Sequence, residues 1–266
     1  MKSVAELMNL RGRVALVTGG AGQLGPIVCD TLAELGATII VLDMHRERCE
    51  EVARSLAQRH GVETWPLVVN LEHADEVNAA CDAVQERFQK LDILINAAAM
   101  AGATGVEWAG AFSQQSGDLF QRACAVNLVA PFLLVQRCAD LLRKSGHGSV
   151  INFLSIYGVS APDLRIYEGM EMGNSAAYST TKGGMLQMTR WLSTVLAPQV
   201  RVNAISPGGI LADQAEGFIK NYSARTPLGR MGVEEDIKGA VAFLASDLSQ
   251  YVTGQNLMVD GGWTVW

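Results

Sequence analysis

Charged residues are scarce in this sequence, and the scarcity limits what the protein binds. Asp, Glu, Lys and Arg together make up 18% of its 266 residues, against a usual share of roughly 25%. The formal net charge is −6, so binding to nucleic acid through its phosphates is disfavoured and we expect no nucleic-acid partner. A domain with so few charges has apolar surface to cover, which favours contacts between subunits.

Patterns that bind metals or form disulfides are also absent from the sequence. The five cysteines lie far apart, with no C-x-x-C pair and no paired histidines. These spacings predict reduced thiols in a cytoplasmic protein and no metal site. No stretch reaches the ~18 uncharged apolar residues of a membrane helix, and the first residues lack the apolar core and cleavage site of a signal peptide. We therefore expect no membrane partner.

Short apolar runs alternate with longer amphipathic stretches along the whole chain. The runs are apolar at nearly every position, which is typical of strands buried on both faces of a parallel sheet. The alternation predicts one doubly wound α/β domain, with helices on both faces of the sheet. The expected strands are 14–18, 38–42, 64–69, 93–95, 149–154, 200–205 and 256–259, and the expected helices lie near 24–35, 46–59, 74–89, 117–143, 175–196 and 233–246.

A glycine-rich loop follows the first expected strand. It reads Thr18-Gly19-Gly20-Ala21-Gly22-Gln23-Leu24-Gly25, and a helix is expected directly after it. Glycines let the backbone turn sharply and approach a pyrophosphate, while the helix N-terminus offers N–H donors. A glycine turn that only packs strand against helix is the alternative, but the position between strand and helix favours a dinucleotide site.

Asp43 stands at the end of the second expected strand. A carboxylate there accepts hydrogen bonds from both ribose hydroxyls and repels a 2′-phosphate, so the sequence favours NAD(H) over NADP(H). Arg46 and Arg48 follow closely, and a cation there would tolerate the phosphate. A solvated carboxylate at a strand end is the alternative for Asp43.

Tyr178 and Lys182 lie four residues apart in an expected helix and share one of its faces. A neighbouring ammonium favours the phenolate and lowers the pKa of a tyrosine, so this pair predicts proton exchange with an alcohol or carbonyl near neutral pH. Ser155 ends the fifth expected strand. Its hydroxyl is therefore expected at the carboxyl edge of the sheet, where open α/β sheets bind ligands.

With these motifs the sequence resembles the classical short-chain dehydrogenase/reductase family, from about residue 11 to its end. Further matching motifs are Asn127 within Ala125–Leu128, Asn203–Gly208, Thr253–Gln255 and Val259–Gly262. The resemblance implies a single Rossmann-type NAD(P)-binding domain over 1–266, with a mainly parallel seven-stranded sheet. It also implies a homotetramer, or a homodimer, in which the helices near 117–143 and 175–196 pack across a two-fold axis.

The resemblance further implies roles for individual residues in hydride transfer between NAD(H) and a secondary alcohol or ketone. Tyr178 would be the acid/base, Ser155 would hold the substrate oxygen, Lys182 would bind the nicotinamide ribose and tune Tyr178, and Asn127 would order a relay water. The residues expected to bind the cofactor are Thr18, Gly19, Gly22, Gln23, Leu24, Gly25, Asp43, Asn70, Leu71, Asn96, Ala97, Ala98, Tyr178, Lys182, Pro207, Gly208 and Ile210.

Several positions depart from the usual pattern of the family. Gln23 replaces a glycine of the cofactor loop, Ala97 replaces an asparagine, and Asn70 replaces an acid. Ala212 replaces the threonine that usually meets the nicotinamide carboxamide, which leaves the backbone at Ile210 as its partner. None of these changes removes a catalytic group.

An insertion at about 157–174 separates Ser155 from Tyr178 more widely than is usual in the family. We expect it to fold over the mouth of the site, where Arg165, Tyr167, Glu168 and Asn174 would bind a polar substrate and the arginine an anionic group. An exposed loop without function is the alternative.

This segment, together with Ala176–Ser179 and Ser206–Ile210, resembles a family branch from bacterial surface-sugar and flagellin-glycan (nonulosonate) pathways. That similarity implies a sugar or sugar-phosphate substrate. A nucleotide-sugar epimerase or dehydratase and a non-catalytic nucleotide-binding homologue remain as alternatives.

Overall fold

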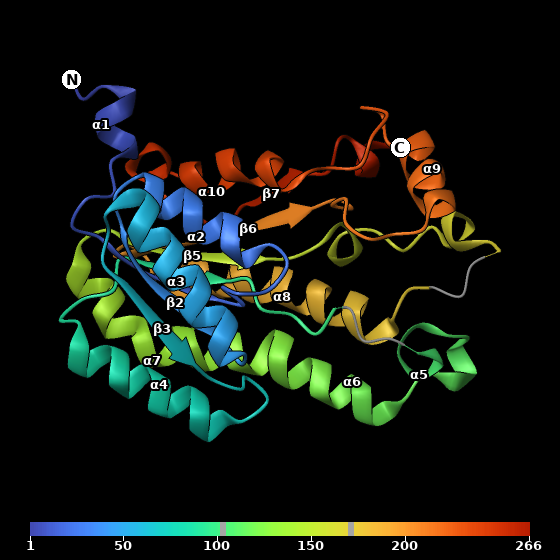
Figure 1. Ribbon diagram of the computed structural model, residues 1–266, viewed down its shortest axis with the longest axis horizontal. Coiled ribbons are helices and arrows are strands. Elements are labelled where there is room, and N and C mark those ends of the chain that lie inside the picture. Colours follow the sequence, from blue (N-terminus) through green and yellow to red (C-terminus); the bar gives the residue numbers. More distant parts are fainter. Residues whose placement is uncertain (102–104, 170–172) are drawn as a thin grey trace.

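Seven parallel strands form one sheet in the order β3-β2-β1-β4-β5-β6-β7 (Figure 1). This computed structural model describes residues 1–101, 105–169 and 173–266. The strands are β1 (Val14–Thr18), β2 (Thr38–Asp43), β3 (Thr64–Val68), β4 (Ile93–Asn96), β5 (Gly148–Phe153), β6 (Val200–Pro207) and β7 (Asn256–Val259). The predicted doubly wound α/β domain is confirmed, and the sheet is parallel throughout.

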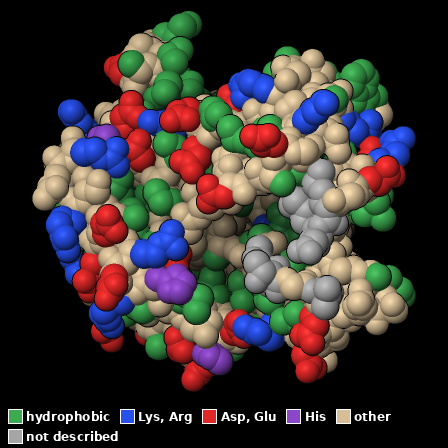
Figure 2. Space-filling model, turned by 45° about the vertical axis from the view of Figure 1, so that its right-hand side comes forward, with side chains coloured by type: hydrophobic (Ala, Val, Ile, Leu, Met, Phe, Trp, Pro, Cys, Tyr) green, Lys and Arg blue, Asp and Glu red, His purple; other side chains and the backbone are tan. Residues whose placement is uncertain are grey.

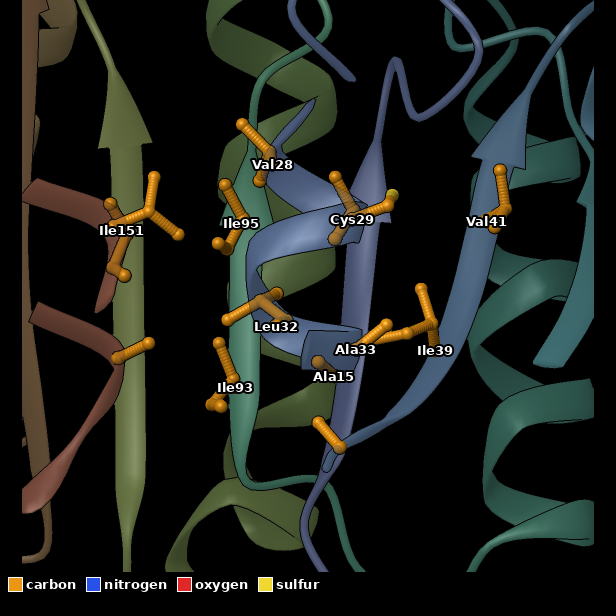
Figure 3. Packing of buried hydrophobic residues seen from close by; sticks show 14 of the residues in the cluster. Ala15, Val28, Cys29, Leu32, Ala33, Ile39, Val41, Ile93, Ile95 and Ile151 are labelled. Atoms are coloured by element: carbon orange, nitrogen blue, oxygen red, sulfur yellow. The ribbon is translucent and has the colours of Figure 1, made fainter. Parts of the chain in front are cut away.

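Helices cover both faces of this sheet. One face is packed by α2 (Gly25–Glu34), α3 (Arg46–His60) and α10 (Lys238–Ala245), and the other by α4 (Ala74–Arg87), α7 (Ala130–Ser145) and α8 (Ala176–Val195). On the first face, α2 lays Val28 and Leu32 over the isoleucines of β4, while Cys29 lies on the side of β1 (Figure 3). Each such side chain contributes roughly 1.5–3 kcal/mol when fully buried, so these contacts fix the start of α2, and with it the glycine loop, against β1 and β4.

The helix expected near 117–143 is not continuous. It consists of α6 (Gly117–Cys124), one π-helical turn η2 (Ala125–Val129) and α7. Pro131 has no N–H to donate to the carbonyl of Asn127, four residues earlier, so the α-helical hydrogen-bond ladder is interrupted there. The π turn carries Asn127 toward the sheet, and such turns are frequent at functional sites.

The same stretch, Gly117–Ser145, is the one segment of the described chain that is long and apolar enough to cross a membrane. In this fold α7 packs on the sheet and against α4. It is therefore a core helix of the domain.

Three helices and several single turns were not expected from the sequence pattern. The helices are α1 (Val4–Met8), α5 (Val106–Ala109) and α9 (Glu216–Arg225). The single turns are η1 (Phe112–Gln114), η3 (Ile156–Gly158), η4 (Leu164–Tyr167), η6 (Asp247–Ser249) and η7 (Trp263–Val265). The helix expected near 233–246 consists of one turn, η5 (Glu234–Ile237), and α10. Four of the unexpected elements, α5, α9, η3 and η4, line a cavity of the site described next.

Candidate active site

A pocket of about 560 Å³ opens at the carboxyl ends of the strands. It lies where the chain changes direction between β1 and β4, the point at which doubly wound sheets bind ligands. The space-filling view shows this face hollowed near its centre, with hydrophobic side chains inside the hollow (Figure 2). The sequence-predicted residues that line the pocket are Gly19, Gly22, Gln23, Leu24, Gly25, Asp43, Asn70, Leu71, Ala97, Ala98, Ser155, Tyr178, Lys182, Pro207, Gly208 and Ile210.

The glycine loop is folded so tightly that side chains would not fit within it. Gly19 has φ of +65°, and a Cβ atom there would lie 2.7 Å from Cα of Ala98. A Cβ atom on Gly25 would lie 1.9 Å from the carbonyl oxygen of Gly19. The loop therefore brings its backbone and the N-terminus of α2 to the pocket wall, the cradle that a pyrophosphate requires. Gln23 is exposed at the edge of the same wall.

Asp43 lies in the wall at the end of β2. Its carboxylate accepts hydrogen bonds from the N–H groups of Ala21, at 3.2 Å, and Met44, at 2.8 Å. Arg48 lines the pocket beside it, whereas the side chain of Arg46 is 71% exposed and pairs with a glutamate of its own helix. Of the two arginines that could tolerate a 2′-phosphate, only Arg48 therefore lines the pocket.

Two residues predicted to bind the cofactor support the pocket from behind and do not line it. The Asn96 side chain is buried and its Nδ2 donates to Oδ1 of Asn152 at 2.8 Å. The Thr18 hydroxyl accepts a hydrogen bond from the N–H of Ala98 at 3.2 Å. Neither side chain lines the pocket, because the Asn96 amide is bonded to the neighbouring strand β5 and the Thr18 hydroxyl to the loop after β4. Their contact with the cofactor stays a prediction.

Ser155, Tyr178 and Lys182 meet at one side of the pocket. The side chains of Ser155 and Tyr178 line the pocket together, and the serine is close enough to lower the pKa of the Tyr178 phenol. The Lys182 Nζ lies 5.7 Å from the centroid of the Tyr178 ring and donates to the carbonyl of Phe153 at 2.6 Å. Helix α8 begins at Ser175, whose hydroxyl accepts from the N–H of Tyr178, so the tyrosine stands in the first turn, next to the end of β5.

Burial shifts the pKa of both α8 residues toward their neutral forms. It lowers the pKa of the Lys182 ammonium to about 8. It also raises the pKa of the Tyr178 phenol, which the nearby Ser155 side chain opposes. The pKa of Tyr178 is thus raised, where the sequence predicted that a neighbouring ammonium would lower it, because desolvation outweighs the opposing effect of Ser155.

Asn127 lies behind the pocket wall. Its Oδ1 accepts from the N–H of Met100 at 2.8 Å, and its Nδ2 donates to the hydroxyl of Thr181 at 3.0 Å. The side chain thus ties the π turn to the loop after β4 and to α8, one residue from Lys182.

A smaller cavity of about 230 Å³ adjoins Ser155 and Tyr178. Of the four insertion residues predicted to bind substrate, Tyr167 and Asn174 line it, and Arg165 and Glu168 do not. The Arg165 side chain is 77% exposed and pairs with Asp163 at 2.7 Å. The two were grouped with the site because they are polar, but the turn η4 directs them outward.

The sequence reasoning also missed residues of this cavity. Tyr157, Phe218 and Tyr222 all line it. Phe218 and Tyr222 come from α9, and their spacing of four residues, typical of one helix face, is the signal that could have located them. Among the described residues, no Lys, Arg, Asp or Glu lines this cavity, and no cluster of three metal-binding side chains is found.

Comparison with protein families gives a match over nearly the whole chain. A family model described as "Enoyl-(Acyl carrier protein) reductase" matches residues 20–264. The chain is 32% identical to a 3-oxoacyl-[acyl-carrier-protein] reductase of Aquifex aeolicus, over 96% of this chain and 98% of the relative. It is 30% identical to post-translational flagellin modification protein A of Campylobacter coli, over 96% and 99% of the two chains.

Solved structures resemble this one closely. A short-chain dehydrogenase from Leptospira borgpetersenii with bound NAD+ is 35% identical, with a TM-score of 0.81 over 99% of this chain and 96% of that chain. A gluconate 5-dehydrogenase from Burkholderia cenocepacia, in complex with NADP and tartrate, is 29% identical, with a TM-score of 0.86 over 99% and 100%. Similar structures thus hold both forms of the cofactor.

Proposed function

The chain belongs to the classical short-chain dehydrogenase/reductase family and is an NAD(P)-dependent oxidoreductase that acts on CH–OH groups; we propose that it uses NAD(H) and a neutral, hydroxyl-rich secondary alcohol or ketone, such as a sugar or polyol. One observation carries the proposal. The glycine loop and the group formed by Ser155, Tyr178 and Lys182 line the same pocket. A dinucleotide cradled by the loop would therefore reach the tyrosine.

Tyr178 is the acid/base in this proposal. Its phenol exchanges a proton with the substrate oxygen, and the Ser155 hydroxyl, which lines the same pocket, holds that oxygen in place. The nicotinamide, when bound, accepts or supplies the hydride. The residues of the protein therefore act by positioning the substrate and by moving one proton.

Lys182 supplies the charge that makes this proton transfer possible. With a pKa of about 8, it is mainly an ammonium at neutral pH. A positive charge one helical turn from Tyr178 favours the phenolate and offsets part of the cost of burying it. Asn127 is a positioning residue, because it fixes both the Met100 backbone and Thr181. Its ordering of a relay water remains a prediction.

Asp43 supports the preference for NAD(H). Its carboxylate stands in the pocket wall at the end of β2, where it would accept hydrogen bonds from the ribose and repel a 2′-phosphate. Arg48 acts in the opposite sense, so the preference depends on the balance of the two side chains.

The cavity beside Tyr178 supports a neutral substrate. Its described lining offers hydroxyl and amide groups and no charge, so the sugar is favoured over the sugar phosphate. The insertion contributes Tyr167 and Asn174 to it, which makes the segment at 157–174 a substrate loop.

We also propose a homotetramer in the cytoplasm. Large apolar side chains on α7, on the π turn before it and on α8 are exposed, namely Val129, Phe132, Trp191 and Val195. Covering them across a two-fold axis would remove this surface from water. The five cysteines are free, as expected in a reducing compartment.

A screen of cofactors and substrates tests the proposed function. The purified protein is mixed with NAD+ or NADP+ and with secondary alcohols, polyols, sugars and sugar phosphates, and the nicotinamide absorbance is followed. We expect reduction of NAD+ with neutral polyhydroxylated substrates. Preference for phosphorylated sugars would contradict the substrate assignment, and conversion of a sugar with no net cofactor change would indicate an epimerase.

A further inference from the structure

Two tyrosines of the insertion, one at its start and one in its middle, meet beside the cavity next to Ser155 and Tyr178. Tyr157 lies in η3, two residues after Ser155, and Tyr167 ends η4. Their hydroxyl oxygens are 2.8 Å apart, within hydrogen-bond distance. Both side chains line the cavity that Ser155 and Tyr178 share. The pair therefore stands beside the place where the reacting carbinol is held.

Packing against α9 holds Tyr167 in this position. Ile166 is 3% exposed and belongs to the same apolar cluster as Phe218. The Tyr167 ring lies 5.5 Å from the Phe218 ring between centroids. Asp163, which begins η4, forms an ion pair with Arg225 of α9 at 2.9 Å. The turn is thus a docked element, and the hydroxyl of Tyr167 has a defined place.

Asn174 connects this side of the cavity to α8. Its side chain lines the cavity with Tyr167 and acts to lower the pKa of that phenol, and its Oδ1 accepts from the Ser179 hydroxyl at 2.7 Å. Gln115 fixes the same residue from outside, through its Nε2 and the Asn174 carbonyl at 3.3 Å. These contacts join both ends of the insertion to the helix that carries Tyr178.

The two phenols remain neutral across the physiological range. Burial raises the pKa of both Tyr157 and Tyr167. Each group can therefore both donate and accept a hydrogen bond, as an alcohol does. The described lining of the cavity has no charged side chain beside these two phenols. They are therefore better suited to bind a hydroxyl group of a substrate than its phosphate or carboxylate.

We propose that the Tyr157–Tyr167 pair determines specificity by binding a second hydroxyl of the substrate, next to the carbinol that Ser155 and Tyr178 hold. The inference rests on the proposed function of the same site. The cavity of about 230 Å³ is smaller than the roughly 300–1,000 Å³ of pockets for drug-sized ligands. The substrate class is therefore a small vicinal diol or hydroxyketone, including sugars oxidised next to a hydroxyl.

Substrate pairs that differ by one hydroxyl test this proposal. The pairs are 2,3-butanediol (all three stereoisomers) with 2-butanol, and D-galactose with 2-deoxy-D-galactose. We compare kcat and KM in the wild type, in Tyr167→Phe and in Tyr157→Phe. Each substitution removes only a hydroxyl and keeps the ring that packs in the cavity. Tyr251→Phe is the matched control, because the Tyr251 side chain is fully exposed elsewhere on the surface.

The expected result is a wild type that prefers the member of each pair with the second hydroxyl. Each of the two cavity variants reduces this preference about fivefold, the size of one neutral hydrogen bond, through KM and with kcat nearly unchanged. The control keeps the preference, and unfolding curves confirm that all variants fold.

Two results would overturn the inference, and they are distinguishable. In the first, Tyr167→Phe and Tyr157→Phe turn over the substrates with the same preference as the wild type. The tyrosine pair then does not bind a second hydroxyl, while the proposed function stands. No NAD(P)-dependent turnover of any alcohol or ketone by the wild type would contradict the proposed function itself, and the inference with it.

Discussion

Tyr178 and Lys182 are held one helical turn apart in surroundings that disfavour the charge of each. Burial lowers the pKa of the lysine to about 8 and raises that of the tyrosine. Because the two charges are opposite, each stabilises the other when both are present. We therefore expect Tyr178 to lose its proton most easily while Lys182 is an ammonium.

Replacing Lys182 with methionine changes how stability depends on pH. Below about pH 8 the folded wild type keeps a buried ammonium at a cost in free energy. Between about pH 8 and the ordinary lysine pKa of 10.5, the folded chain has lost this proton and the unfolded chain has kept it. The stability of the wild type therefore rises with pH across this window, whereas methionine contributes no such dependence.

Unfolding by denaturant at several pH values between 7 and 10.5 measures this effect in the cofactor-free proteins. We expect the stability of Lys182→Met relative to the wild type to fall by roughly 1–3 kcal/mol across the window. Because all other titrating groups are common to both proteins, they cancel in the difference. Parallel pH profiles would show that the Lys182 pKa is not lowered.

Asp43→Ala tests whether Asp43 binds the cofactor ribose and so determines the preference between NAD(H) and NADP(H). Loss of the carboxylate removes hydrogen bonds from a charged acceptor and the repulsion of a 2′-phosphate, so the preference for NAD(H) over NADP(H) falls by about 10- to 100-fold. The Kd values of both reduced cofactors, measured by nicotinamide fluorescence, check this. Asp75→Ala, an exposed residue on α4, has the same change in net charge and keeps the preference. An unchanged ratio in Asp43→Ala would show that this residue does not contact the ribose.

The sequence contained most of the candidate site at the level of residues. Motif spacing placed Gly19, Gly25 and Asp43 correctly on the pocket wall, because glycine loops and strand ends have local signals. It could not separate Asn96, which lines no pocket, from its neighbour Ala97, which does. That distinction depends on which side of β4 a side chain occupies, and Asn152 on the adjacent strand decides it.

The pairing of η4 with α9 forms one side of the cavity next to Tyr178, the proposed substrate site. Ile166 is buried among aromatic side chains of α9, including Phe218 and Tyr222. The insertion therefore acts as a wall whose position depends on tertiary contacts. An element docked in this way affects substrate binding without touching the cofactor loop.

Ile166→Ala tests this dependence. The change removes buried methyl groups and costs about 2–5 kcal/mol of local packing, so η4 loses its fixed position and the KM for the substrate rises about tenfold. The Kd for NADH stays unchanged, because the cofactor loop lies on the other side of the pocket. Leu164→Ala in the same turn is the control, since Leu164 is 62% exposed and leaves both values unaltered. Equal KM values for the two variants would show that docking of η4 does not matter for the substrate.

At the scale of elements, strands were more predictable than helices. The runs Val14–Thr18 and Asn256–Val259 have the predicted bounds, because apolar β-branched runs mark buried strands. The π turn within 117–143 was not predicted, since one proline in an amphipathic pattern does not show whether the helix kinks or ends. Helix α9 was missed because only Phe218, Ile219 and Tyr222 mark its apolar face in a short, polar segment.

The whole molecule leaves apolar side chains uncovered on one side. Trp191 on α8 is 54% exposed, and Phe132 on α7 is 36% exposed. Only 18% of the residues in the chain are charged. The low charge content and these exposed groups have the same explanation if two copies of the chain pack through α7 and α8.

Trp191→Glu tests the proposed assembly. A carboxylate buried at a subunit contact without a partner costs several kcal/mol, so the variant shifts from tetramer toward smaller species. Size-exclusion chromatography with light scattering gives the mass in solution. Val4→Glu, which adds the same charge at an exposed position of α1, leaves the mass as in the wild type. A wild type that is monomeric, or a Trp191→Glu variant that keeps the tetramer mass, would contradict the assembly.

The central claim concerns the molecule as a catalyst: one pocket holds NAD(H) beside a tyrosine that transfers the proton. Tyr178→Phe tests it most directly, because the substitution removes a single hydroxyl and keeps the ring. The decisive measurement is the rate of NAD+ reduction by the variant on the substrate found for the wild type, together with its Kd for NADH. The account predicts a rate lower by about 100-fold or more with an unchanged Kd, and a variant with turnover close to that of the wild type would contradict it.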